Sequence, residues 1–214
     1  MALTISGLSK SRIEALADGI FATVMTVLIL SLSIPTIVGT NQAVESYVLS
    51  LGPIILSYVM SFLILGVFWV RHHNAFHFVS KVDNTFIWLN IVFLLTIGFV
   101  PFSTELIGRY PTAETSAIVY GANLVATGVC MQGMWLYASR RKLLVADGLD
   151  EETMSAVNRR LTGGPLLYSF AIALTLITGG TIIAIAIYVF AIIYYVLASS
   201  LGFWSRLRPR SKRP

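Results

Sequence analysis

Charged residues are scarce in this chain. Asp, Glu, Lys and Arg make up 12% of its 214 residues, against about 25% in ordinary soluble domains, while 56% of the residues are hydrophobic. A chain of this length cannot bury so much apolar surface when it folds in water. The apolar residues gather in stretches of about 20, the length that crosses a hydrocarbon core of about 30 Å as a helix. We therefore predict an all-α integral membrane protein that resides in the lipid bilayer.

Cysteine is nearly absent as well. The single cysteine, Cys130, lies within an apolar run, which excludes an intrachain disulfide and a cysteine-based metal site. No Gly-rich phosphate loop, nucleophile elbow or paired catalytic carboxylates occur, so we predict neither an enzyme nor a cofactor. The net charge of +5 comes from basic residues between and after the apolar stretches. Membrane topology accounts for that pattern better than a nucleic acid partner does.

Six apolar segments are predicted to span the membrane within a single domain, residues 1–214. Pro35 closes the first, Gly52-Pro53 opens the second, and Asp83-Asn84 provides an N-cap before the third. The apolar region 161–204 is too long for one span, and Gly179-Gly180 is the predicted turn within it. A short cytoplasmic helix is predicted over residues 149–161. The predicted spans are 12–34, 48–70, 85–106, 116–137, 161–178 and 181–204.

The basic residues give these spans an orientation. Of the 15 Lys and Arg residues, all but Arg109 fall in the two terminal segments and the even-numbered loops, which would share one side of the membrane. Cytoplasmic loops carry the excess of Lys and Arg in membrane proteins. We therefore predict a multi-pass protein of the cell membrane with both termini in the cytoplasm.

Polar side chains inside the predicted spans are the first candidates for function, because a charge at the bilayer centre costs roughly 2.5–3.5 kcal/mol on insertion scales. Asp18 lies in the first span, Trp69 and three histidines near the end of the second, and Asn90 at the start of the third, all at the same predicted depth. Their N–H and carboxylate groups are complementary. We predict one structural hydrogen-bond network, formed by Arg12, Asp18, Trp69, His73, His77 and Asn90.

The histidines, His72, His73 and His77, leave two other interpretations open. His73 and His77 share a helix face at i, i+4 spacing, as metal or catalytic ligands do, but no H-E-x-x-H motif accompanies them. A proton relay is the second interpretation, because buried histidine and carboxylate groups can take up and release protons. The static network that holds three helices together is preferred to both.

The first span carries a second pattern. Thr23, Val27, Leu30 and Ile34 recur at i, i+4, i+7 and i+11 and therefore form one stripe along a helix. Periodicity alone is equally consistent with a face that meets lipid and with a face that meets other helices.

The segment around this stripe resembles a known signature. Arg12, followed by Leu16-Ala17-Asp18, resembles the first-helix motif of the transmembrane-protein-175 family of potassium channels, in which an Arg precedes Phe-Ser-Asp by four residues. Further pieces match in family order: Thr26-Val27-Leu28, Trp69, His72-His73, Asp83, Trp88-Leu89-Asn90 and Val100-Pro101-Phe102-Ser103-Thr104. The length suits a prokaryotic member with one six-helix repeat.

The resemblance implies a homo-tetramer whose pore is lined by the first helix of each subunit and narrowed by aliphatic side chains. Its constriction positions correspond to Thr23, Val27 and Leu30, with Thr26 and Ile34 adjacent to the pore. The chain contains no TVGYG-type carbonyl filter, which agrees with this expectation. The resemblance also implies passive conduction of monovalent cations, K⁺ among them, through a hydrophobic gate.

Two departures modify the expectation. The motif serine is replaced by Ala17, and Thr23 stands where the family usually has Ile or Leu. A threonine offers hydroxyl oxygens to a partly dehydrated ion, so we expect weak selectivity for K⁺ over Na⁺. A proton-conducting channel that uses the Asp and His residues, and a secondary transporter, are the alternative functions.

Overall fold

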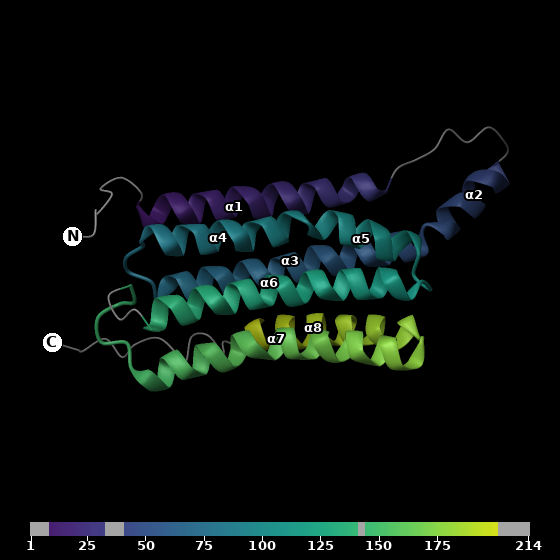
Figure 1. Cartoon of the computed structure of the whole chain (residues 1–214). Coiled ribbons are helices and arrows are strands. Elements are labelled where there is room, and N and C mark those ends of the chain that lie inside the picture. Colours follow the sequence, from purple (N-terminus) through teal and green to yellow (C-terminus); the bar gives the residue numbers. More distant parts are fainter. Residues whose placement is uncertain (1–8, 33–40, 141–143, 201–214) are drawn as a thin grey trace.

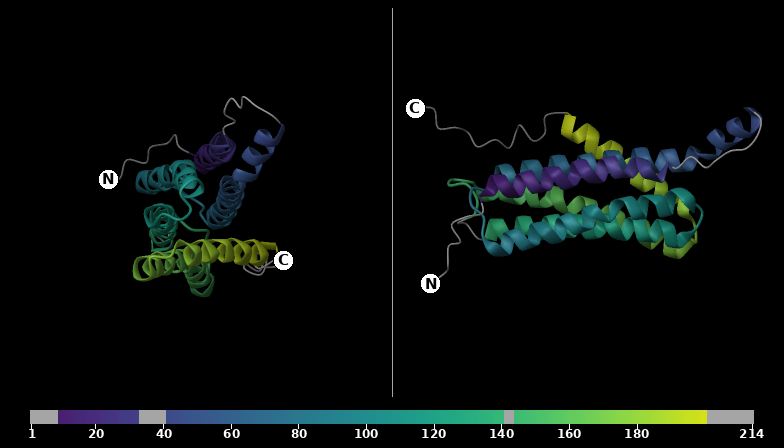
Figure 2. Two further views of the ribbon diagram at one scale, coloured as in Figure 1. Left: turned by 90° about the vertical axis from the view of Figure 1, so that its right-hand side faces the viewer. Right: turned by 90° about the horizontal axis from the view of Figure 1, so that it is seen from above.

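The computed structural model describes residues 9–32, 41–140 and 144–200, and these residues form a bundle of helices (Figure 1). Helix α2 extends beyond one end of the bundle, and α8 crosses the bundle obliquely, while the remaining helices run along a common direction (Figure 2). In chain order the elements are α1 (Lys10–Val27), the 3₁₀ turn η1 (Leu28–Ser31), α2 (Asn41–Ser50), α3 (Gly52–His77), α4 (Asn84–Gly98), α5 (Val100–Arg109), α6 (Glu114–Arg140), α7 (Glu151–Thr178) and α8 (Thr181–Ser200).

Five stretches of the described chain are long and apolar enough to cross a membrane. They are α1 with η1, α3, α4 with α5, α6, and α7. Helix α8 adds a shorter apolar stretch over Thr181–Leu197. The described residues thus provide five candidate spans and a shorter apolar helix where the sequence predicts six spans.

Several helix ends follow from local signals that the sequence shows. Asp83 caps α4, because its Oδ1 accepts the Phe86 N–H at 2.8 Å. Pro53 lies in the first turn of α3, where its missing N–H costs nothing. Gly179 ends α7 with a φ of 66°, a left-handed conformation that glycine adopts without strain. The predicted turn between the last two helices is therefore confirmed.

Other boundaries differ from the sequence predictions. Helix α2 begins in the segment predicted as the first loop and ends at Ser50, inside the predicted second span, so the long helix of that span starts only at Gly52. The third span consists of two helices, because Pro101 lies in the first turn of α5 and its ring would clash with a carbonyl four residues earlier. Helix α7 begins at Glu151 rather than near residue 161, so the predicted short helix and the fifth span are one helix of 28 residues.

Helix α7 continues through Pro165 where it lies against α6. A side chain at Gly128 of α6 would place its Cβ 2.6 Å from Pro165 Cγ. Glycine is therefore the residue that allows the two helix backbones to approach at this point.

The packing leaves α1 on one side of the bundle and α7 and α8 on the opposite side, with α6 between them (Figure 2). Helix α1 contacts α3, α4 and α5, and η1 contacts α3 and α5. At the end where α1 begins, the α3–α4 connection is joined to the segment after α6. Val79 and Val145 form an isolated β-bridge there, and the Ser80 N–H donates to the Leu144 carbonyl at 2.8 Å.

Candidate functional site

Helix α1 and η1 have one packed face and one open face. The open face carries three of the predicted stripe residues: Thr23 is exposed, Val27 is 40% exposed and Leu30 is 72% exposed. The buried residues recur every three or four positions on the other face and belong to the core, and they are Ile13, Ala17, Phe21, Val24 and Leu28. Thr26 is exposed with the stripe, and Ile34 lies outside the described residues.

The open face presents hydroxyl oxygens and methyl groups without charge. Thr23 Oγ1 donates to the Gly19 carbonyl at 2.8 Å, and Thr26 Oγ1 donates to the Thr23 carbonyl at 2.7 Å. Because these bonds use the hydroxyl hydrogens, the oxygens keep acceptor capacity toward the open side. No charged residue follows Asp18 in α1 or η1. The face can therefore accept a cation through oxygen dipoles but cannot hold it as an ion pair.

A hydrogen bond between α1 and α3 lies at the start of this face. Trp69 Nε1 donates to Asp18 Oδ1 at 2.8 Å, and the ring of His73 stacks on the Trp69 ring with centroids 5.7 Å apart. The Asp18 carboxylate is exposed in the single chain. Three residues of the predicted network are thus brought together around one charged acceptor.

Asn90 is bonded to a different histidine from the two that the sequence prediction included. His72 Nε2 lies 2.9 Å from Asn90 Oδ1, and both side chains are buried. The His72 ring stacks between Phe76 and Phe93, with centroid distances of 4.1 and 5.3 Å. This pair joins α3 to α4, behind the packed face of α1.

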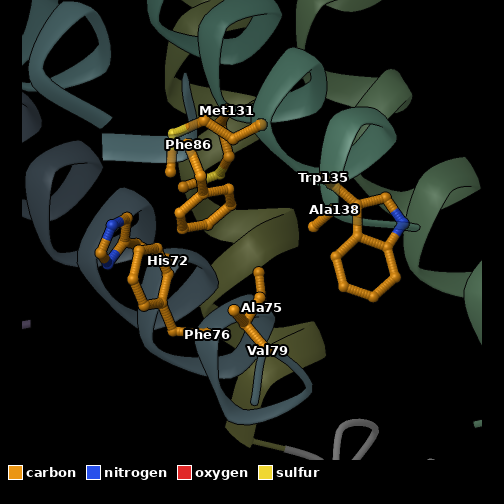
Figure 3. Close-up of a pocket in the computed structure, with 9 residues that line it drawn as sticks. His72, Ala75, Phe76, Val79, Phe86, Met131, Trp135 and Ala138 are labelled. Carbon is orange, nitrogen blue, oxygen red and sulfur yellow. The ribbon is translucent and has the colours of Figure 1, made fainter. Parts of the chain in front are cut away.

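A small apolar cavity adjoins His72 (Figure 3). Its volume is about 10 Å³, comparable to the space for one water molecule. The close-up shows Phe76, Phe86 and Met131 around it together with Trp135. The cavity is too small and too apolar to hold a substrate, so we assign it to packing.

The remaining two residues of the predicted network lie apart from these pairs. Arg12 and His77 are exposed, and within the described residues no side-chain hydrogen bond or ion pair connects either to Asp18, Trp69 or Asn90. The His77 ring meets the edge of Phe78 instead, at 5.6 Å. The single predicted network therefore consists of two separate groups, with Arg12 and His77 outside both.

Sequence reasoning missed a set of buried hydroxyl and amide groups near the middle of the bundle. Thr104 Oγ1 lies 2.6 Å from Ser61 Oγ, which in turn lies 3.1 Å from the hydroxyl of Tyr120. Asn123 Nδ2 donates to Ser103 Oγ at 3.1 Å. Ser103 and Thr104 were visible in the sequence as polar residues after Pro101, but their partners on other helices were not.

Arg71 is a further buried polar residue that the sequence analysis did not single out. It is 5% exposed, its Nη2 donates to the Arg160 carbonyl at 2.6 Å, and its guanidinium lies 4.7 Å from the centre of the Tyr195 ring. These contacts tie α3 to α7 and α8. Among the described residues, no group of three or more His, Cys, Asp or Glu side chains is placed to hold a metal ion.

Comparison with known proteins identifies the family. Residues 12–101 match the family described as "Endosomal/lysosomal potassium channel TMEM175". A potassium channel of Chamaesiphon minutus is 36% identical over 172 residues, which cover 78% of this chain and 84% of that protein. The chain belongs to the TMEM175 family. This is a family of ion channels and not of enzymes, and the resemblance found in the sequence is confirmed.

The TMEM175 relationship extends to the fold. The crystal structure of a lysosomal potassium-selective channel TMEM175 homolog from Chamaesiphon minutus superposes with a TM-score of 0.74 at 31% identity, covering 89% of this chain and 97% of that chain. The chicken protein named endosomal/lysosomal proton channel TMEM175 is 34% identical over 110 residues, which cover 48% of this chain and 22% of that protein. The match is therefore nearly complete for the bacterial relative and partial for the vertebrate one.

Proposed function

We propose that this chain is the subunit of a potassium-permeable cation channel, in which the open face of α1 from each subunit lines a central pore. The observation that carries the proposal is the uncharged, exposed stripe of Thr23, Val27 and Leu30, opposite a face that is fully packed. A homo-tetramer with these faces around one axis would turn each stripe residue into a ring. The relatives named as potassium channels support the proposed channel function.

The stripe suggests how such a pore would conduct. Rings of Val27 and Leu30 form a hydrophobic gate, because narrow apolar constrictions lose water readily. Thr23 and Thr26 present hydroxyl oxygens that replace part of the hydration shell of a passing ion. These oxygens are fewer than in a carbonyl cage, so the channel would conduct passively, with weak selectivity for K⁺ over Na⁺.

The proposed topology has six spans, with α8 as the sixth, in the cell membrane. Lys10 and Lys81 lie at the end of the bundle where α1 begins, while Arg109 lies at the other end and is paired with Glu105 at 2.9 Å. By the positive-inside rule the first of these ends faces the cytoplasm, and the basic residues of the sequence favour the same side for both termini.

The polar contacts near the start of α1 would set its tilt. The Trp69–Asp18 hydrogen bond fixes α1 against α3, and the buried His72–Asn90 pair fixes α3 against α4. Hydrogen bonds to charged groups are the stronger class, which suits Asp18 to a positioning role.

A proton-conducting channel is the second candidate. Asp18 is exposed on α1 next to Trp69 and His73, so a titratable carboxylate and an imidazole lie close to the proposed pore. The vertebrate relative named as a proton channel is consistent with this function.

Ion flux from proteoliposomes that contain the purified protein tests the proposal. Under separate K⁺ and Na⁺ gradients, K⁺ flux above Na⁺ flux, without a coupled second ion, is expected. Proton flux without either cation would favour the second candidate, and uptake against a gradient would instead indicate a secondary transporter. Empty vesicles and vesicles that carry heat-denatured protein are the controls.

A further inference from the structure

The break between α4 and α5 carries polar groups that the proposed pore does not use. Pro101 follows Val100 in the first turn of α5, and the helix restarts there after Phe99. Ser103 and Thr104, within the first two turns, direct their hydroxyls to the Val100 carbonyl at 3.0 and 2.8 Å. The residues Val100, Ser103 and Thr104 are fully buried, so this turn is a fixed internal structure rather than a frayed helix end.

The same turn is joined to two other helices. Thr104 contacts Ser61 of α3, and Ser61 contacts Tyr120 of α6, while Asn123 of α6 donates to Ser103. All these side chains are buried, and a buried hydroxyl that loses its partner is costly. The start of α5 is therefore held in one position between α3 and α6.

The end of the first span, formed by η1, contacts two of the helices that these hydrogen bonds connect. The 3₁₀ turn η1 contacts α3 and α5, and its residue Leu28 is completely buried. Val27 and Leu30, on either side of Leu28, are exposed on the opposite face. Val27 ends α1 and Leu30 lies three residues later in η1, a spacing at which side chains share a helix face. The contacts that fix η1 against α3 and α5 therefore also set the direction in which Leu30 points.

We propose that the hydrogen-bonded group of Ser61, Thr104 and Tyr120 positions the Leu30 side chain in the pore, acting through α5 and the buried Leu28. This inference rests on the proposed function for its consequence, because Leu30 is a constriction residue only if the open face of α1 lines the pore. Its structural content, the direction of Leu30, can be measured whether or not ions flow. Ser61 and Thr104 are positioning residues and do not touch the ion.

The test uses Leu30→Cys as a reporter in a Cys130→Ser background, so that the reporter carries the single thiol. The rate of its modification by a water-soluble charged methanethiosulfonate is measured in proteoliposomes. Loss of one buried hydrogen bond corresponds to about a fivefold change in a two-state equilibrium. Adding Thr104→Val, which keeps the side-chain shape, is therefore expected to change the modification rate about fivefold.

Thr175→Val is the matched control. Thr175 is equally buried, but its hydroxyl donates to the Ala171 carbonyl of its own helix, on the side of the bundle away from α1. This control is expected to leave the rate unchanged. Ser61→Ala should reproduce the effect of Thr104→Val from the α3 side, and Thr104→Ser should restore the original rate.

The inference would be overturned if the Thr104→Val and Ser61→Ala proteins kept the modification rate of the Leu30→Cys parent, or if Thr175→Val changed the rate by a similar factor. If Thr104→Val does not fold, Ser61→Ala and Thr104→Ser decide the question. Flux of K⁺ through the wild-type protein is measured in parallel. Its absence would refute the proposed function while leaving the result on the direction of Leu30 intact.

Discussion

Replacing Gly128 by alanine tests the close contact between α6 and α7. The new Cβ would lie 2.6 Å from Pro165 Cγ and 2.9 Å from Cδ, closer than ordinary van der Waals contact. The proline ring cannot rotate away, so the helices must separate. Overpacking of this kind costs about 1–3 kcal/mol. The higher helix propensity of alanine offsets about 1 kcal/mol of this loss in the free energy of unfolding.

Because the contact is with a rigid ring, the overpacking cost should lie in the upper part of its range. After the gain in helix propensity is subtracted, Gly128→Ala is expected to lower the free energy of unfolding by about 1 to 2 kcal/mol. For a chain of this size that lowers the midpoint of thermal unfolding by roughly 2–8 °C. Gly133 of the same helix is the control, because a Cβ there meets nothing within 4 Å. Gly133→Ala should raise the midpoint by about 2–4 °C through helix propensity alone.

Unfolding of both proteins in detergent is followed by the loss of the monodisperse peak on size exclusion after heating. Equal midpoints for Gly128→Ala and Gly133→Ala would refute the reasoning. So would a Gly128→Ala protein more stable than the wild type, since the contact with Pro165 would then be absent in solution.

Three further outcomes are expected. Leu30→Ala should raise single-channel current, because it would widen the proposed gate at a side chain that contributes little to the packing of its own subunit; unchanged current would remove Leu30 from the proposed gate. Asp18→Ala and Trp69→Phe should each impair assembly or opening while leaving the ratio of K⁺ to Na⁺ flux unchanged. Because both variants remove the same hydrogen bond, the double variant should be no more impaired than either single variant. An altered flux ratio in intact oligomers would contradict a positioning role. The hydrogen bonds from Thr153 lower the pKa of Asp150, so the stability that this cap adds to α7 should be complete above about pH 4 and be lost as the pH falls through the lowered pKa. The difference in unfolding midpoint between wild type and Asp150→Ala should shrink accordingly at acid pH, and a constant difference would argue against the cap.

The parts of the fold that depend on one local signal can be predicted from the sequence. Asp83 caps a helix because its side chain reaches an N–H three residues away, and Gly179 ends one because it adopts a positive φ. The stripe of Thr23, Val27 and Leu30 follows from helical periodicity, and the structure places it on a single open face.

The parts that depend on neighbouring helices could not be predicted. Proline usually ends or bends a helix, and α7 continues past Pro165 against a facing glycine on α6. His72 and His73 differ by about 100° around α3, and the position of α4 decides that His72 and not His73 meets Asn90. The partners of Ser103 and Thr104 lie on α6 and α3, far away in sequence.

The polar start of α7 illustrates a second limit of prediction from the sequence. Hydropathy places the fifth span near residue 161, because the residues before it are largely polar. The helix nevertheless begins at Glu151, where Asp150 accepts the Thr153 N–H at 2.6 Å. Hydropathy indicates where a helix enters the membrane, and capping indicates where it starts, so the two boundaries differ whenever a helix extends into water.

The claim that the open face of α1 lines the cation path is tested most directly by blocking that path. In a Cys130→Ser background, K⁺ flux through Val27→Cys protein is measured in proteoliposomes before and after treatment with a positively charged methanethiosulfonate. Leu176→Cys is the control, since Leu176 is exposed on α7 at the opposite side of the bundle. We expect the reagent to abolish flux through the Val27→Cys protein and to leave the Leu176→Cys protein unaffected. Full K⁺ flux after confirmed modification of Val27→Cys would contradict the account.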